Sequence, residues 1–230
     1  MKKIGLVGGT GPESTLMYYR ELNSRIDEKT NGETMPDLAV ESVNFHRAWN
    51  YVTTEQYDDL AEYLAQKVNH LVDGGAEVVS LTAATMHIVW DELCERIKVP
   101  LVSIPKAVCE EVVTAGYHKV GLPGTIFTME QNYMKKDLLD AGVEVFIPEK
   151  SDRELVAKRI YEELERGVVK ESTLEEFNQI ILKMRKENGI EAVILGCTEL
   201  PLLLHSDNAP LPCLDSVDIH IKKLIELAME

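Results

Sequence analysis

Short apolar runs alternate with helix-like segments along the whole chain, and this alternation constrains the fold more than any other feature. In the first half, strand-like runs occur at residues 4–7, 38–43, 78–81 and 100–104. The segments between them have the spacing of helices, at residues 13–29, 56–73, 107–115 and through Trp90 and Ile97. Repeated strand–helix alternation is typical of parallel sheets, whose strands are joined by helical crossovers. The pattern therefore predicts an α/β protein with mainly parallel sheets.

The second half repeats this plan. Strand-like runs occur at residues 119–122, 143–147 and 192–195, and helix-like segments at residues 129–139, 155–166 and 174–187. Val120 follows Ile4 by 116 positions, and Ile194 follows Val79 by 115. Matched offsets of this kind predict two similar α/β units that arose by internal duplication.

Composition excludes several classes of function. The 230 residues are 45% hydrophobic, which is enough for a packed core, and no apolar stretch reaches the length of a membrane span. With no signal-peptide pattern at the N-terminus, we expect a soluble, cytoplasmic protein. The formal net charge of −15 argues against nucleic-acid binding, which needs a basic surface. The four cysteines lie far apart and no histidine spacing suits a metal, so neither a disulfide framework nor a metal site is predicted.

Small and polar residues gather where four of the predicted strands end, at residues 8–12, 82–87, 124–128 and 196–199. In open α/β sheets, ligands bind outside the carboxyl ends of the strands. If the two units face each other, the four turns line one cleft, where we expect the functional site. The first turn, Gly-Gly-Thr-Gly-Pro, has neither the spacing of a dinucleotide fingerprint nor that of a P-loop. A tight turn that binds a small anion is favoured over a nucleotide site there.

Cys197 is the most reactive residue type at any of these strand ends. A free cysteine is often simply a small buried apolar residue. The alternative is a functional thiol, since a helix N-terminus can lower the pKa of a cysteine and make it a base or nucleophile. The remaining cysteines, Cys94, Cys109 and Cys213, are expected in the core. His87 and His220 are isolated, which favours structural hydrogen bonding over catalysis.

Several sequence blocks together resemble the aspartate/glutamate racemase family. They read IGLVGGTGPEST, TAATMH, GTIFTMEQ, GCTELP and DSVDIH, and they extend from residue 4 to residue 220. The resemblance implies two similar α/β domains related by a pseudo-twofold axis, with the active site in the cleft between them. It also implies a last helix that returns to the first domain, giving domains of residues 1–104 plus 214–230 and residues 105–213. Such enzymes need no cofactor and form homodimers.

In this family, one cysteine removes the Cα proton of an amino acid and a second cysteine returns a proton to the opposite face. The resemblance assigns Cys197 as the cysteine of the second domain, with Thr198 and Glu199 beside it. Thr125 and Thr128 match threonines that bind the substrate carboxylate. Backbone N–H groups and hydroxyls of this kind would also stabilise developing negative charge.

The matching block of the first domain departs from the family pattern Cys-Asn-Thr-x-His. Thr85 and His87 match, but Ala83 and Ala84 occupy the cysteine and asparagine positions. Thr82 is one residue too early, and on a strand its side chain would face the other way. The lysine that aspartate-specific members carry near residues 162–166 is also absent. The candidate residues are therefore catalytic Cys197 and Thr82, and substrate-binding Thr10, Arg47, Ala83, Ala84, Thr85, Thr125, Thr128, Thr198 and Glu199.

Three functions remain open on the sequence. The first is a racemase of aspartate, glutamate or a related amino acid that is weak, one-sided or altered in substrate because Ala83 replaces a thiol. In that case Thr82, His87 or a bound water would serve the second face. The second is a single-cysteine lyase or isomerase of the same fold, similar to enzymes that decarboxylate substituted malonates. The third is a non-catalytic protein that binds a small carboxylate or a protein partner.

Overall fold

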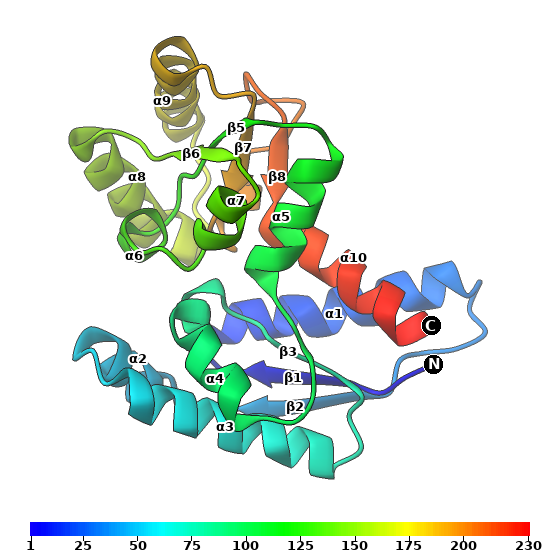
Figure 1. Cartoon of the computed structure of the whole chain (residues 1–230). Coiled ribbons are helices and arrows are strands. Elements are labelled where there is room, and N and C mark those ends of the chain that lie inside the picture. The colour runs from blue at the N-terminus through cyan, green and yellow to red at the C-terminus, as the bar shows by residue number, and fades with distance from the viewer. The chain divides into compact units, whose positions relative to one another are not determined.

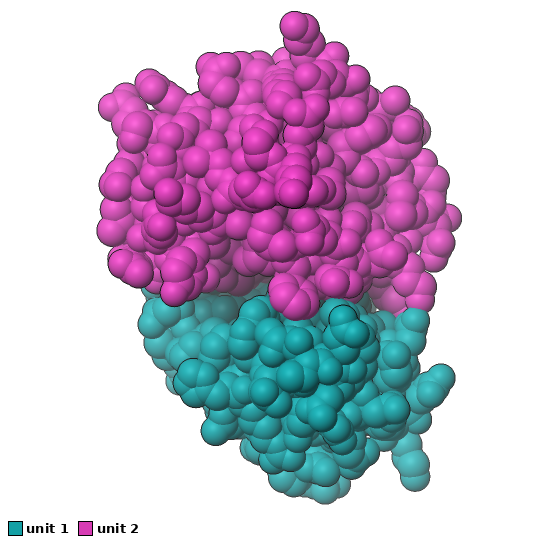
Figure 2. Space-filling model, turned by 90° about the vertical axis from the view of Figure 1, so that its left-hand side faces the viewer, with its two compact units in different colours: residues 1–104, 220–230 teal, residues 105–219 magenta.

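A computed structural model describes all residues from Met1 to Glu230. The chain forms two compact units, which are coloured separately in Figure 2. Unit 1 comprises Met1–Ile104 and His220–Glu230, and unit 2 comprises Pro105–Ile219. Each unit has its own four-stranded parallel sheet, so the predicted fold class of two similar α/β domains is confirmed. No helix combines the length and the apolar composition needed to cross a membrane.

Unit 1 is built on a sheet with the strand order β2-β1-β3-β4. The strands are β1 (Ile4–Gly8), β2 (Leu38–Ser42), β3 (Val78–Leu81) and β4 (Leu101–Val102). All their pairings are parallel. Helices α1 (Pro12–Lys29) and α3 (Tyr57–Asp73) lie on opposite faces of this sheet (Figure 1), and α2 (Phe45–Thr53) and α4 (Trp90–Arg96) complete the crossovers.

Unit 2 repeats the topology in the order β6-β5-β7-β8. Its strands are β5 (Lys119–Gly121), β6 (Glu144–Phe146), β7 (Ala192–Leu195) and β8 (Cys213–Asp215). Its helices are α5 (Ile104–Thr114), α6 (Ile126–Glu130), α7 (Lys136–Asp140), α8 (Lys150–Glu162) and α9 (Glu171–Asn188), and α10 (Ser216–Met229) follows β8 and ends in unit 1. Phe177 and Ile181 of α9 pack with Val193 and Leu195 of β7 in one apolar cluster.

The strand boundaries correct the predicted internal offset by one residue. β3 and β7 have equal lengths and start at Val78 and Ala192, so equivalent positions on these strands are 114 residues apart. Ile194 is therefore equivalent to Ser80 and not to Val79. An offset of 115 came from matching hydrophobic residues, but Ser80 is itself fully buried inside the strand. A buried serine in a continuous apolar run hides the true alignment from a hydrophobic pattern.

Two segments differ from the sequence expectations. The helix predicted at residues 129–139 is two short helices, α6 and α7, and the ammonium group of Lys135 ends α6 by donating to the carbonyl of Met129 at 3.0 Å. A hydrophobic spacing does not reveal this cap, because it depends on a side chain that folds back on the chain. Helix α2 was not predicted. It begins at Asn44, whose side chain accepts a hydrogen bond from the N–H of Arg47.

His220 of α10 anchors the C-terminal segment inside unit 1. Its Nδ1 lies 2.7 Å from the Tyr18 hydroxyl, and its Nε2 lies 3.0 Å from Ser80 Oγ and 3.2 Å from the Val102 carbonyl. Because Nε2 faces a carbonyl oxygen, it carries the proton, and Nδ1 accepts from Tyr18. Burial lowers the pKa of His220 to about 3, with a further contribution from His87. His220 is therefore a neutral structural residue, as its isolation in the sequence indicated.

Candidate active site

The thiol of Cys197 stands where β7 ends. The strand Ala192–Leu195 is fully buried and delivers the chain to Gly196 and Cys197 at its carboxyl end. Gly196 is required there, because a Cβ atom would lie 2.7 Å from Thr128 Cγ2 and 3.0 Å from the Pro123 carbonyl oxygen. Cys197 is 9% exposed and belongs to the edge of the apolar cluster of unit 2. It is thus a thiol that is nearly buried yet lies at a strand end, where parallel sheets bind ligands.

The carboxylate of Glu199 is the polar partner of this thiol. Cys197 Sγ donates to Glu199 Oε2 at 2.7 Å. Burial raises the pKa of Cys197 well above its usual value, and the negative charge and hydrogen bond of Glu199 raise it further. The backbone N–H groups of Glu199 and Leu200 act in the opposite direction but are outweighed. The expectation that a helix N-terminus lowers the pKa of this thiol is therefore wrong, because burial and an adjacent carboxylate dominate.

A second carboxylate, Glu165, lies within electrostatic reach of Glu199. Burial raises the pKa of Glu165, the charge of Glu199 raises it further, and Arg166 partly opposes both. Glu165 could not be recognised from the sequence, because the pairing of these two glutamates depends on the fold of unit 2. The only local signal was the missing lysine near residues 162–166.

Glu163, two residues earlier, is a buried structural anion and not part of this group. It is 4% exposed and accepts hydrogen bonds from Thr173 at 2.6 Å, Arg159 at 2.7 Å and Lys170 at 3.0 Å. Hydrogen bonding from Thr173 is the largest factor that lowers the pKa of Glu163. This residue joins α8 to α9 and stabilises the segment that carries Glu165.

Hydroxyl groups line the neighbouring strand end, after β5. Thr125 begins α6 and its Oγ1 accepts from the N–H of Thr128 at 3.2 Å. Thr128 is 2% exposed, and its hydroxyl donates to the Gly196 carbonyl at 3.2 Å. The hydroxyls of Thr125 and Tyr133 lie 3.1 and 3.0 Å from the same Thr128 oxygen. Thr128 therefore holds the residue before Cys197, and the half-buried Thr125 and Thr198 are the more accessible hydroxyls.

The backbone of unit 1 repeats the turn that carries Cys197. The N–H of Thr82 donates to the Val7 carbonyl at 3.1 Å, as the N–H of Gly196 donates to that of Pro123 at 3.1 Å. One residue later, the carbonyl of Ala83 accepts from Met86 and that of Cys197 accepts from Leu200. With the offset of 114 positions, Ala83 is the equivalent of Cys197, and Thr85 is the equivalent of Glu199. This turn shares these two backbone hydrogen bonds but offers no thiol and no carboxylate.

His87 stabilises this unit 1 turn through hydrogen bonds. Its Nδ1 lies 3.3 Å from the Ala83 carbonyl and 3.1 Å from that of Ala84, and its Nε2 accepts from the N–H of Ile104 at 3.2 Å. The ring also stacks on Trp90, with a centroid separation of 4.7 Å. Burial lowers the pKa of His87 to about 4. Both ring nitrogens are occupied in the neutral form, so His87 is a structural residue, as its isolation in the sequence indicated.

Thr82 is 1% exposed, and its hydroxyl faces the interior of unit 1. Its Oγ1 lies 3.4 Å from the Val7 carbonyl and 3.4 Å from Thr15 Oγ1. Its carbonyl accepts from Ser14 at 2.7 Å, which joins the strand end to the first turn of α1. No carboxylate or histidine contacts the Thr82 hydroxyl, so no group in this surrounding activates it as an acid or base.

The glycine-rich turn after β1 has a shape that only glycine permits. Gly9 has φ of 82°, and a Cβ atom there would lie 2.4 Å from Ser42 Oγ. Its N–H donates to Thr15 Oγ1 at 2.9 Å. The hydroxyl of Thr10 is buried and has no hydrogen-bond partner. An unpaired buried hydroxyl beside the N-terminus of α1 suits a polar ligand, in line with the predicted small-anion site.

Arg47 is an exposed cation held in place by aromatic rings. It lies in the first turn of α2, 4.4 Å above the ring of Tyr63 and 5.6 Å above that of Tyr51. Its Nε donates to the Tyr51 hydroxyl at 3.0 Å. Its two terminal nitrogens make no hydrogen bond within unit 1, so the guanidinium is oriented and able to bind a carboxylate.

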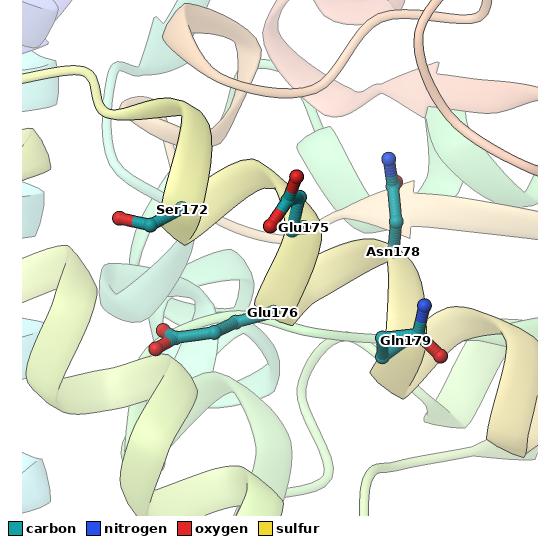
Figure 3. A pocket seen from close by; sticks show the side chains of 5 residues that line it. All are labelled: Ser172, Glu175, Glu176, Asn178 and Gln179. Atoms are coloured by element: carbon teal, nitrogen blue, oxygen red, sulfur yellow. The ribbon is translucent and has the colours of Figure 1, made fainter.

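The surface also has hollows that lack reactive groups. One is lined by residues from a single helix, α9: Ser172, Glu175, Glu176, Asn178 and Gln179 (Figure 3). In it, Glu176 accepts two hydrogen bonds from Arg159. Another is lined by Glu149, Lys150, Ser151 and Glu154 at the start of α8. Asn178 Oδ1, in the first hollow, is buried and has no hydrogen-bond partner. Neither hollow holds a thiol, so the strand ends are the stronger candidates for a reactive site.

The other three cysteines do not add a second thiol site. Cys109 and Cys213 are half-buried, whereas Cys94 is exposed. The expectation that Cys94 lies in the core is wrong, because α4 is short and buries only Leu93.

Comparison with known proteins connects both units to one family. The family model described as Asp/Glu/Hydantoin racemase matches residues 7–224. An aspartate racemase homologue from Pyrococcus horikoshii OT3 is 40% identical, with a TM-score of 0.91 and 100% of both chains covered. A proposed Asp/Glu racemase from Yersinia pestis is 33% identical, with a TM-score of 0.94 and 100% of both chains covered. A glutamate racemase from Corynebacterium glutamicum is 26% identical over 144 residues, which are 62% of this chain and 50% of that protein.

Proposed function

The chain belongs to the Asp/Glu/hydantoin racemase family, and from this premise we propose that it is a cofactor-independent amino-acid racemase of the aspartate/glutamate type. In this proposal, Cys197 is the acid/base that exchanges the Cα proton of the substrate. The observation that carries it is the buried thiol at the end of β7, which is hydrogen-bonded to Glu199 at 2.7 Å. The half-buried hydroxyls of Thr125 and Thr198 supply polar contacts for the substrate carboxylate.

Proton exchange at Cα needs a group that both removes and returns a proton on the same face. The carbanion that forms is stabilised when negative charge on the substrate carboxylate meets fixed hydrogen-bond donors. Thr128 stabilises this arrangement, because its hydroxyl donates a hydrogen bond to the carbonyl of Gly196, the residue before the thiol. Arg47 is the proposed partner of a distal carboxylate, since its guanidinium is oriented by Tyr51 and Tyr63. Thr10, with its unpaired buried hydroxyl, is the proposed contact in the glycine-rich turn.

Inversion also requires an acid or base on the second face. The unit 1 turn supplies alanines at positions 83 and 84, which exchange no protons, together with Thr85. The hydroxyl of Thr82 is buried and has no activating partner. We therefore expect exchange from the Cys197 face to be faster than inversion, with Thr82 or a bound water serving the second face slowly.

The decisive experiment is proton NMR of L- and D-aspartate and of L- and D-glutamate with the protein in deuterated buffer, followed by chiral analysis. Loss of the Cα signal that outpaces formation of the opposite enantiomer is the expected result. Cys197→Ala should reduce exchange by about 10³-fold, in the range that a positioned acid/base contributes. Cys213→Ala is the matched control, because it removes a half-buried thiol from the same unit at the start of the neighbouring strand β8.

Unchanged exchange in Cys197→Ala would overturn the assignment of this residue. Equal rates of exchange and inversion in the wild-type protein would instead refute the one-sided reaction and require an effective second acid. Circular dichroism of each variant separates these results from a loss of folding.

One observation favours a second candidate function. The raised pKa of Cys197 keeps the thiol protonated at neutral pH, which suits an enzyme that only donates a proton. A decarboxylase of substituted malonates has this need, because loss of carbon dioxide leaves a carbanion that one thiol can protonate. Release of carbon dioxide from a malonate panel, abolished in Cys197→Ala, would support this reaction. No release, together with amino-acid exchange, would exclude it.

A carboxylate-binding protein without turnover is the remaining alternative. It predicts a thermal shift with dicarboxylates and no conversion of any substrate. Homodimer formation is part of the racemase proposal because the family resemblance implies it, and a cytoplasmic location is proposed with it. Sedimentation of the purified protein tests the first of these directly.

A further inference from the structure

The glycine-rich turn after β1 has the conformational freedom to adopt more than one shape. Gly9 and Gly11 flank Thr10, and their φ angles are 82° and 122°, in the left-handed region that glycine enters readily. Glycine has more alternative backbone conformations than any other residue, so the two glycines leave the orientation of Thr10 weakly determined. A contact from outside the turn is therefore needed to hold Thr10 in one place.

The hydroxyl of Thr15, near the start of α1, supplies this contact. Its Oγ1 accepts from the N–H of Gly9 at 2.9 Å and donates to the carbonyl of Gly11 at 3.2 Å. The backbone groups on both sides of Thr10 thus bond to one oxygen atom. The Thr15 side chain also lies against Gly8, where a Cβ atom would be 2.5 Å from Thr15 Cγ2. A larger residue at position 8 would push the hydroxyl away from the turn.

The start of α1 also contacts the turn after β3. Thr15 Oγ1 lies 3.4 Å from Thr82 Oγ1, and the hydroxyl of the neighbouring Ser14 donates to the Thr82 carbonyl at 2.7 Å. Ser14 and Thr82 are both buried. These contacts connect the glycine-rich turn to the residue before Ala83.

Unit 2 contains a matching threonine. Thr128 of α6 lies against Gly124, where a Cβ atom would be 3.0 Å from Thr128 Cγ2, and its hydroxyl donates to the Gly196 carbonyl at 3.2 Å. Gly196 is the equivalent of Thr82 at the offset of 114 positions. In each unit, a threonine on the helix after the first strand packs on a glycine and contacts the residue that follows the third strand. The contact therefore belongs to the strand ends of both units and is not an accident of one turn.

We propose that Thr15 is a positioning residue of the substrate site, whose hydroxyl holds the glycine-rich turn in the shape that presents Thr10 to the substrate. This inference rests on the proposed function, in which Thr10 contacts the substrate, and deepens it. Thr15 itself does not touch the substrate, because its hydroxyl already joins Gly9 to Gly11. The Thr10 hydroxyl has no hydrogen-bond partner within the protein, so its hydrogen-bonding capacity is kept for a ligand.

Loss of the Thr15 hydroxyl should weaken substrate binding without slowing the bound enzyme. When only a fraction of the protein has the binding-competent turn, the apparent dissociation constant rises by the inverse of that fraction. The hydroxyl makes two hydrogen bonds to the turn, and losing both shifts a local equilibrium by about 10- to 100-fold. KM should therefore rise by about 10-fold, whereas kcat should stay within about 2-fold, because the substrate selects the competent turn.

A pair of substitutions isolates the hydroxyl. Thr15→Ala and Thr15→Ser both remove the methyl group that lies against Gly8, and they differ only in the hydroxyl. In Cα exchange of L-aspartate, Thr15→Ala should show the rise in KM, and Thr15→Ser should have a KM within about 2-fold of wild type. Thr30→Ala is the matched control and should behave as wild type, because the Thr30 hydroxyl donates to the Ile26 carbonyl at the other end of α1.

Amide hydrogen exchange of Gly9, followed by NMR, provides a readout that needs no substrate. In the wild-type protein, the hydrogen bond to Thr15 protects the Gly9 N–H. Its exchange should be about 10-fold faster in Thr15→Ala than in Thr15→Ser, while the amides of β1 exchange equally in the two variants. A general loss of stability would instead accelerate exchange in β1 together with Gly9.

Three results would overturn the inference: equal Gly9 exchange in Thr15→Ala and Thr15→Ser, the same rise in KM in both variants, or a fall in kcat of Thr15→Ala with KM unchanged. If the wild-type protein converts no amino acid, the proposed function fails, and the Gly9 amide still decides whether Thr15 holds the glycine-rich turn. The two failures are therefore distinguishable.

Discussion

The turns after β3 and β7 share two backbone hydrogen bonds and differ in chemistry. In both, the N–H of the residue after the strand donates to a backbone carbonyl, that of Val7 for Thr82 and that of Pro123 for Gly196. The carbonyl of the next residue accepts from the N–H three positions later. In unit 2 this next residue is Cys197, bonded to Glu199, whereas in unit 1 it is Ala83, whose carbonyl faces His87. The comparison teaches that two similar units can share the hydrogen bonds of a turn while only one of them carries a thiol beside a carboxylate.

The two turns are also stabilised differently. The unit 2 turn depends on close packing, since Gly196 lies against Thr128 and Pro123 with no room for a side chain. The unit 1 turn depends on a buried neutral histidine that joins Ala83, Ala84 and Ile104. Acid should therefore destabilise unit 1. A larger side chain at position 196 should destabilise unit 2.

The largest expected effect is the acid sensitivity of the unit 1 turn. The pKa of His87 falls from 6.5 to about 4 on folding, so its contribution is present above pH 6.5 and is lost as pH falls toward 4. The free energy of unfolding should decrease by about 3 kcal/mol over this range from His87 alone. His87→Gln, which does not titrate, should lack this decrease in urea titrations between pH 7 and 4.

Tryptophan fluorescence makes this measurement specific to one unit. Trp49 and Trp90 both belong to unit 1, and Trp90 stacks on His87. The tryptophan signal should change at a higher pH than the ellipticity, which reports both units. Coincident acid transitions, or an unchanged pH dependence in His87→Gln, would contradict this difference between the turns.

The second-largest expected effect is the loss of stability when a side chain is added to Gly196 in the unit 2 turn. Gly196→Ala would place a methyl group against Thr128 and should lower the free energy of unfolding by about 1–3 kcal/mol, the usual cost of overpacking. Thr128→Ser removes the nearest methyl group, so the double variant should recover part of this loss in urea unfolding. Additive losses in the double variant would show that this contact is not the source of the constraint.

The smallest expected effect is a gain of function in the unit 1 turn. Ala83→Cys combined with Ala84→Asn should raise the rate of inversion about 10-fold, which is below the usual contribution of a positioned acid/base because Thr85 replaces the glutamate of unit 2. Chiral chromatography of aspartate and glutamate reactions measures it. Ala83→Ser with Ala84→Asn is the matched control without a thiol, and equal rates in the two variants would show that a thiol at position 83 does not reach the substrate.

Local patterns in the sequence determined much of the scaffold. The alternation of apolar runs and helical spacing located β1, β2, β3 and β7 closely, because buried parallel strands are continuous apolar runs. It failed at α6 and α7, where the side chain of Lys135 ends a helix, and it missed α2, a short helix of nine residues. The strand-end motifs also identified Cys197 and the alanines of the unit 1 turn from their order along the chain.

The tertiary structure decided the chemical state of the site. The sequence alone suggested a thiol with a lowered pKa, but burial beside Glu199 raises it, and Glu165 joins this group from 34 positions earlier in the chain. The equivalence of Ala83 and Cys197 likewise required the strand register and matching backbone hydrogen bonds. Local sequence determines which segments become strands and helices, because propensity and periodicity act over a few residues. The pKa of a buried group depends on desolvation and on charges brought close by folding, so only the folded structure determines it.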